Sequence, residues 1–202
     1  MFTIARRLWK IQDVKNTQRK SIVGRTGKIL LIAVTALFAL AIFLGFEWRP
    51  AKVVSARQAD LISAIESRNK TKIRKLLADD YLDRWGFSAD DATESIVDVG
   101  SQFLTLLILT DEQSLERDGE RIVAIAELTA EGNAIGPVGN AVVRRINQLD
   151  APFIFKWEKQ SLFPTSWRVV EIDNPDLPGE LYGYKPGDIR RALNGDATGL
   201  IE

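Results

Sequence analysis

The stretch DDYLDRWGFSADD, Asp79 to Asp91, decides the fold of this chain. It places five aspartates and three aromatic residues in thirteen positions, a density that fits either an active site or a corner between two helices. Gly86 permits a turn, and Ser88 is suited to cap a helix. The acids that follow, Asp90 among them, favour the positive end of a helix. We therefore predict a helix end, a glycine corner and a capped helix start.

Three residues of the stretch are not needed for this corner: Tyr81, Asp83 and Trp85. A carboxylate between two aromatic rings fits the wall of a ligand pocket, where burial raises the pKa of a carboxyl group. We therefore take these three as candidate ligand-binding residues. Three further candidates come from the rest of the chain: Phe103, Glu127 and Trp157.

Helical patterns lie on both sides of the corner. Leucine and isoleucine recur on one helical face between Ser55 and Asn69, and again over residues 72–81. The capped start at Ser88 predicts a third helix, with Gly100 as its candidate end. The sequence therefore predicts three helices in succession.

After the third helix, the apolar period changes from helical to alternating. We expect four strands, over residues 103–116, 121–131, 152–160 and 167–173. Asp118-Gly119 is a strong hairpin signal between the first two. Residues 134–150 fit either a helix or an irregular strand.

Three helices followed by about four antiparallel strands indicate an α+β fold. Together with the Asp-Tyr…Trp-Gly corner and the closing WRVVEID, this order over residues 56–174 resembles the nuclear transport factor 2-like superfamily. The resemblance implies a cone-shaped domain, in which three helices pack on a curved sheet around a pocket. It also implies a wide range of functions, from isomerases and dehydratases to binding modules and secretion-system scaffolds.

Aromatic residues at alternating spacing fit either the lining of an apolar pocket or an ordinary core. The six residues concerned are Trp85, Phe87, Phe103, Phe153, Phe155 and Trp157. Both interpretations are open at the level of the sequence.

An isomerase- or dehydratase-like site would need a base and a hydrogen-bond donor inside the cone. Asp80 or Asp83 is the candidate base, Tyr81 the candidate donor, and Glu127 a further carboxylate. Capping and solvation already explain most of the acids, and the middle strand is mostly apolar. We therefore predict no catalytic residue.

The chain has no cysteine and no histidine. This excludes thiolate nucleophiles, disulfides, serine–histidine catalysis and histidine zinc sites within it. The order D-D-Y-L-D does not match a calcium loop. We expect no metal and no cofactor, and the acidic balance after residue 28 argues against nucleic acid.

Residues 29–46 are eighteen uncharged, mostly apolar residues. As a helix they would be about 27 Å long, close to the roughly 30 Å of a bilayer core. Eight basic residues precede them against Asp13 alone, which places the N-terminus in the cytoplasm. We predict a single-pass inner-membrane protein with a periplasmic C-terminal domain; a signal peptide cleaved near Ala56 is the alternative.

The expected layout has five parts: a basic cytoplasmic leader (1–28), a transmembrane helix (29–46), a linker (47–55), the extracytoplasmic domain (56–174) and a Pro/Gly-rich surface tail (175–202). The expected partners are the bilayer, anionic lipid near the leader and a protein at the membrane. This plan is similar to that of the periplasmic assembly subunit of type IV secretion systems. We predict a non-enzymatic binding or assembly module for a protein partner or a hydrophobic ligand, with a small-molecule isomerase or dehydratase as the alternative.

Overall fold

The structure is a computed structural model that describes residues 30–43, 45, 49–179 and 183–193. The chain divides into two compact units, Met1–Glu47 and Trp48–Glu202. In the first unit, the described residues 30–43 form a helix whose side chains are all exposed. The predicted leader and parts of the predicted membrane helix, Ile29, Leu44 and Phe46, lie outside the described residues. Within the described ranges, no helix combines the length and the apolar content needed to cross a membrane.

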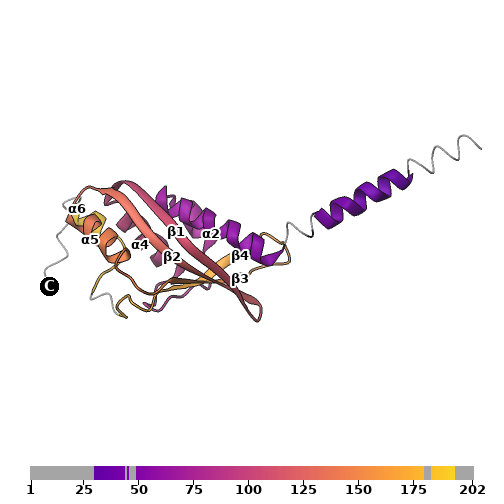
Figure 1. The fold of residues 1–202 in the computed structure, drawn as a ribbon. Coiled ribbons are helices and arrows are strands. Elements are labelled where there is room, and N and C mark those ends of the chain that lie inside the picture. Colours follow the sequence, from indigo (N-terminus) through magenta and orange to yellow (C-terminus); the bar gives the residue numbers. More distant parts are fainter. Residues whose placement is uncertain (1–29, 44, 46–48, 180–182, 194–202) are drawn as a thin grey trace, which may run out of the picture. The chain divides into compact units, whose positions relative to one another are not determined.

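The second unit begins with the three predicted helices (Figure 1). They are α2 (Pro50–Glu66), α3 (Lys70–Leu76) and α4 (Ala89–Gly100). Helix α2 starts six residues before the expected domain boundary, because proline at the first helical position has a favourable φ angle and Val53 and Val54 are already buried. Six of the residues expected in the linker, Pro50 to Ser55, therefore belong to α2.

The four predicted strands form one antiparallel sheet in the order β1-β2-β3-β4. Their bounds are β1 (Phe103–Asp118), β2 (Arg121–Ala134), β3 (Phe153–Lys159) and β4 (Trp167–Asp173). The hairpin between β1 and β2 turns at Gly119, whose φ of 61° is a left-handed conformation that glycine adopts without steric cost. Register shifts between Thr110 and Gln113 and between Lys156 and Trp157 bend the strands. The α+β class and the sheet are thus confirmed.

Two further helices correct the expectation of three. Helix α5 (Pro137–Ile146) resolves the open question over residues 134–150, since β2 ends at Ala134 and a helix follows. A Cβ atom at Gly139 would lie 2.8 Å from the Cβ of Ala134 and 3.0 Å from the carbonyl oxygen of Gln102, so glycine lets α5 pack closely against this corner. Helix α6 (Asp188–Leu193) lies in the expected tail.

The core lies between the helices and the concave face of the sheet. Its largest fully buried side chains are Trp157 and Phe103, followed by Leu61, Ile73 and Leu77. The indole nitrogen of Trp157 donates to Gln58 Oε1 on α2 at 3.0 Å, so this buried polar atom is satisfied. Leu77, after α3, bridges to Val169 of β4.

Strand β1 is an edge strand of the sheet. Side chains from the end of α2 and the turn after it contact its outer backbone groups. Ile108 N donates to Glu66 Oε1 at 2.8 Å, and the guanidinium group of Arg68 donates to the carbonyl oxygens of Phe103 and Leu104. The first half of this edge is therefore partly covered.

Candidate functional site

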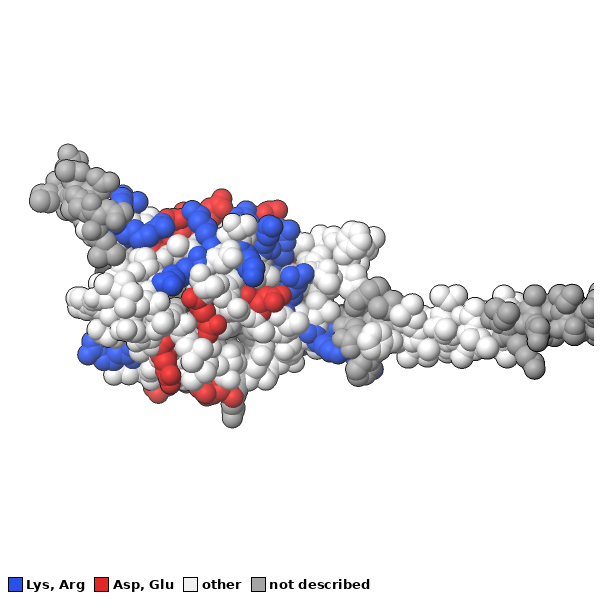
Figure 2. All heavy atoms as spheres, turned by 90° about the horizontal axis from the view of Figure 1, so that it is seen from above, with Lys and Arg blue, Asp and Glu red and all other residues white. Residues whose placement is uncertain are grey.

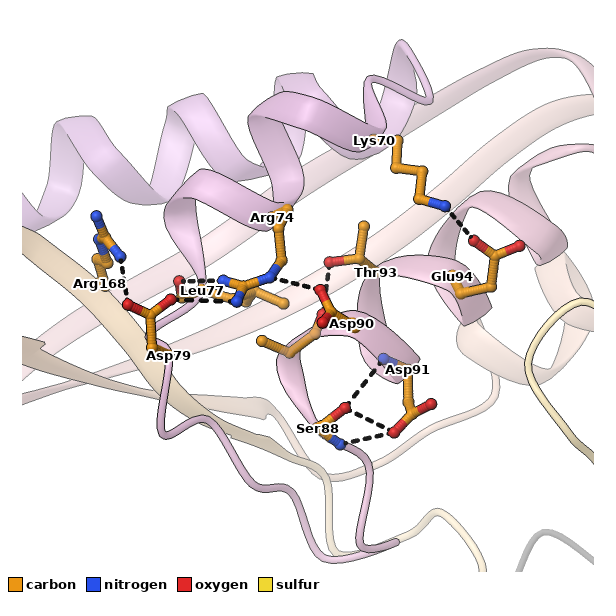
Figure 3. A network of polar contacts seen from close by, with 11 residues as sticks. Lys70, Arg74, Leu77, Asp79, Ser88, Asp90, Asp91, Thr93, Glu94 and Arg168 are labelled. Atoms are coloured by element: carbon orange, nitrogen blue, oxygen red, sulfur yellow. Dashed lines mark hydrogen bonds and ion pairs between the residues drawn. The ribbon is translucent and has the colours of Figure 1, made fainter.

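Most acids of the stretch from Asp79 to Asp91 have structural roles (Figure 3). Asp79 lies 3.1 Å from Arg74 and 3.7 Å from Arg168. Asp90 lies 2.7 Å from Arg74 Nε. Ser88 caps α4 as predicted, and Asp91 completes a capping box with it. Asp79 and Asp90 are exposed and Asp91 is half-buried, so these carboxylates hold the corner together and do not form a buried site.

Charges are paired in the same way on the surface around the corner. Lys70 on α3 lies 2.6 Å from Glu94 on α4. On the face viewed in Figure 2, basic and acidic side chains lie next to one another. Such interleaving produces no large single-sign field on this face, so it is poorly suited to a polyanion.

Asp83 is the exception among the acids, since only 8% of its surface is exposed. Its Oδ1 accepts hydrogen bonds from the backbone N–H groups of Trp85 at 3.0 Å and Phe87 at 2.9 Å. Its Oδ2 accepts from the Tyr81 hydroxyl at 3.3 Å. Burial raises the pKa of Asp83, while these hydrogen bonds act in the opposite direction. The corner thus folds around one buried carboxyl group.

Tyr81 is also buried, with 4% of its surface exposed. Burial, and then the negative charge of Asp83, raise the pKa of the Tyr81 hydroxyl far above its ordinary value. Tyr81 therefore remains a protonated donor at every physiological pH. Tyr81 and Asp83 form the polar part of a wall that is otherwise apolar.

This wall belongs to a cavity of about 490 Å³ between the helices and the sheet. Its volume lies within the range of roughly 300–1,000 Å³ that is usual for small-molecule pockets. The apolar lining comes from α2, α4, β1, β2, β3 and β4, and includes Ile62, Ile96, Ile108, Leu128, Phe155 and Ile172. The described residues that line it include no lysine or arginine. The cone is therefore hollow, with an apolar interior.

The C-terminal segment covers part of the cavity. Leu177, Pro178, Tyr184 and Ile189 all belong to the lining. The indole nitrogen of Trp85 donates to the carbonyl oxygen of Pro178 at 2.8 Å, which ties this segment to the corner. Residues expected to form a tail on the surface thus help to enclose the cavity.

Asp98 holds this segment in place. It is fully buried in α4 and accepts hydrogen bonds from the Tyr184 hydroxyl at 2.9 Å, Ile189 N at 3.1 Å and Arg190 N at 2.8 Å. Arg190 of α6 also forms an ion pair with Glu94, which lies on α4 one turn before Asp98. Burial raises the pKa of Tyr184 to about 12, so its hydroxyl stays a donor to Asp98.

The six candidate ligand-binding residues fall into three groups. Tyr81, Asp83 and Trp85 lie together in the cavity wall. Phe103 and Trp157 are fully buried and belong to the core instead of the lining. Glu127 is exposed and lines a separate hollow of about 250 Å³. The aromatic set divides likewise, since Phe87, Phe153 and Phe155 line the cavity.

The site residues that the sequence did not reveal are Asp98, Tyr184 and Ile189. Asp98 sits on the buried side of an amphipathic helix, where a carboxylate needs partners. The sequence signal that could have revealed α6 is Asp188, because an acid is favoured in the first turn of a helix. Nothing local joins this pattern to Asp98, because the two lie 90 positions apart in the chain.

Carboxylates do not gather into a metal site in the part of the chain that the structure describes. Its side chains contain no group of three or more acids with the arrangement to hold a metal ion. The hollow next to Glu127 does contain Asp111 and Asp150, but it lacks that arrangement.

Comparisons with known proteins gave structural neighbours only. No protein-family model and no curated protein matches the chain. Among solved structures, it is similar to a nuclear transport factor 2-like superfamily protein from Salmonella enterica serovar Typhimurium, with 16% identity and a TM-score of 0.47 over 67% of this chain and 100% of that one.

Two further neighbours are similar at the same level. A hexachlorocyclohexane dehydrochlorinase from Novosphingobium barchaimii has 13% identity and a TM-score of 0.47, over 61% of this chain and 84% of that one. Bd1075 from Bdellovibrio bacteriovorus has 8% identity and a TM-score of 0.46, and the match spans 61% of this chain and 40% of that longer one. These similarities concern the fold alone, so the function of this chain is argued from its own residues.

The buried carboxyl group predicts a pH-dependent stability. Because burial raises the pKa of Asp83 in the folded state, its contribution to stability is fully present below about pH 3.9, the ordinary pKa of aspartate. It is lost as the pH rises through the raised pKa. The free energy of unfolding of the native protein relative to Asp83→Asn should therefore fall as the pH rises above about 4.

Urea denaturation of both proteins across a pH series measures this difference. Asp80→Asn is the matched control, because it removes an exposed carboxylate from the same stretch. A difference between native protein and Asp83→Asn that stays constant or grows with pH would contradict a buried Asp83.

Proposed function

We propose that this chain is a non-enzymatic binding module that holds a neutral, hydrophobic small molecule in its cavity. The observation that carries the proposal is an apolar cavity of about 490 Å³ whose polar wall is limited to a few groups. Pockets of this size and composition are the usual form of small-molecule sites. A buried anion would meet no basic residue among the described lining residues and would face Asp83, so a charged carboxylate or phosphate ligand is disfavoured.

The proposal includes attachment to the inner membrane through residues 29–46, with the domain in the periplasm. The support is the uncharged run of eighteen residues after a basic leader. A hydrophobic molecule is sparingly soluble in water, so a carrier benefits from a position next to the bilayer. Contact with a protein partner at the membrane, as in an assembly module, remains compatible with this arrangement.

An isomerase- or dehydratase-like enzyme is the second candidate, because Asp83 and Tyr81 meet in the cavity wall. A base must have an oxygen available to a substrate proton. Both oxygens of Asp83 already accept hydrogen bonds. Two of these three bonds come from backbone N–H groups of the corner, and the third comes from the Tyr81 hydroxyl. The geometry therefore supports a structural carboxyl group better than a base.

Saturable binding of a neutral apolar probe tests the proposal. The hydrophobic core lies entirely within Trp48–Glu202, so this unit is expected to fold alone. N-phenyl-1-naphthylamine should bind it with a dissociation constant on the order of 10 µM, if each of its roughly 17 non-hydrogen atoms contributes about 0.4 kcal/mol. Fluorescence titration measures this binding. A signal that does not saturate, or a stoichiometry well above one, would contradict a single internal site.

A further inference from the structure

The loop between β3 and β4 carries the most exposed large apolar side chain of the described residues. Leu162 is 96% exposed, and its neighbour Phe163 is 74% exposed. Most loops carry polar residues at such positions, and an aromatic–aliphatic pair in water gains free energy when it finds an apolar environment. The pair is therefore a candidate contact site.

Hydrogen bonds hold the loop in one conformation behind this pair. Ser166 Oγ contacts Ser161 N at 3.0 Å and the carbonyl oxygens of Ser161 at 2.9 Å and Phe163 at 2.8 Å. Ser166 N donates to the same Phe163 oxygen at 3.1 Å. The loop thus presents its apolar side chains from a defined turn, so little conformational entropy is lost when they are buried.

The loop lies beside the start of the domain. Arg57 Nη2, in the second turn of α2, donates to the carbonyl oxygen of Thr165 at 2.8 Å. Figure 1 shows the β3–β4 end of the sheet next to the first turns of α2, with α5 and α6 at the opposite end of the domain. Leu162 and Phe163 are therefore located at the end where the chain enters the domain.

The length of the linker sets the distance from this end to the bilayer. The apolar run ends at Phe46 and α2 begins at Pro50, which leaves four Cα–Cα steps. Even fully extended, these steps span only about 14 Å. With residues 29–46 in the membrane, as proposed above, the start of α2 must lie close to the headgroups.

Basic side chains are present at this end, together with acidic ones. The first turns of α2 and the residue before them carry Arg49, Lys52 and Arg57, of which Arg57 lies 3.7 Å from Asp60 on the same helix. Lys159, at the end of β3, is exposed beside the loop. Acidic side chains of the β1–β2 hairpin, Asp118 and Glu120, lie at the same end of the sheet, so the charge here is mixed and the apolar pair carries the argument for a membrane interface.

We propose that Leu162 and Phe163 insert into the periplasmic leaflet of the membrane that holds residues 29–46. The inference rests on the proposed membrane attachment and adds a second contact to it. The bilayer is the occupant that the short linker brings within reach, whereas a protein partner would need its own apolar groove. The insertion fixes the orientation of the domain, so that α5, α6 and the covered side of the cavity face away from the lipid.

Single-cysteine labelling tests the insertion in the full chain. Since the natural sequence has no cysteine, Leu162→Cys introduces one labelling position for an environment-sensitive nitrobenzoxadiazole group. Leu104→Cys is the matched control, because Leu104 is also exposed, at 62%, but lies near the start of β1 at the other end of the sheet. Both proteins are reconstituted into phosphatidylethanolamine–phosphatidylglycerol vesicles that contain a nitroxide-labelled acyl chain.

We expect the label at position 162 to lie about 5–10 Å into the interface and to be quenched at least about twofold more than the label at position 104. Replacement of Phe163 by serine in the Leu162→Cys protein should reduce this quenching. Equal quenching at both positions overturns the inference while leaving the anchor intact. Failure of the full chain to float with the vesicles overturns the anchor, and with it the inference. A label at position 162 that is not quenched by the lipid, and whose emission changes only after a periplasmic extract is added, also overturns the inference, in favour of a protein partner.

Discussion

Replacement of Ala130 by phenylalanine is expected to weaken the binding of N-phenyl-1-naphthylamine by about 100-fold, equivalent to about 2.7 kcal/mol. Ala130 is 1% exposed, lies in β2 and lines the cavity. A phenyl ring at this position occupies space that the ligand needs. Because the ring enters an existing apolar cavity, the cost of overpacking should stay near the lower end of about 1–3 kcal/mol.

Glu131→Phe is the matched control for this variant. Glu131 is the next residue of β2, so its side chain points to the other face of the sheet, where it is exposed. Fluorescence titration should give a native dissociation constant for Glu131→Phe. Equal weakening in both variants, or unchanged binding in Ala130→Phe with retained stability, would show that the probe binds outside the cavity.

Replacement of Asp98 by alanine is expected to lower the free energy of unfolding by about 3 kcal/mol. The substitution leaves the Tyr184 hydroxyl and the N–H groups of Ile189 and Arg190 without their acceptor in a buried position. Each unsatisfied buried donor costs about 1–3 kcal/mol, although partial release of the segment limits the sum. Urea denaturation measures the change.

Tyr184→Phe separates the role of Asp98 from the general effect of altering the C-terminal segment. It removes one of the three hydrogen bonds and should cost only about 1 kcal/mol. Limited trypsin digestion gives an independent measurement, since the bonds after Arg190 and Arg191 should be cleaved much faster in Asp98→Ala. If Asp98→Ala lowers the free energy of unfolding by less than Tyr184→Phe does, or leaves the digestion rate unchanged, Asp98 does not anchor the segment.

The sequence predicted the corner at Asp79–Asp91 well because its signals are local. A capping serine with acids after it, and a glycine before it, determine which carboxylates face solvent. Once these acids were assigned, Tyr81, Asp83 and Trp85 remained, and the structure brings these three together in the cavity wall. Alternation likewise predicted the sheet, since period-two burial is a property of each strand alone.

The rest of the site depends on pairings between distant segments. Phe103 and Trp157 have the same alternating pattern as Phe153 and Phe155, and only the curvature of the sheet decides which rings fill the core and which line the cavity. The role of Asp98 depends on a segment 90 residues later, and proline and glycine in that segment masked its short helix. Local periodicity cannot predict such contacts.

The polar cover on β1 has a consequence for how this protein behaves at high density. An uncovered edge strand presents free N–H and C=O groups to which another copy can add a strand, and this is a common route to aggregation. Glu66 and Arg68 occupy such groups on β1 at Phe103, Leu104 and Ile108. Copies at high concentration can therefore lie side by side without their sheets joining along this part of the edge.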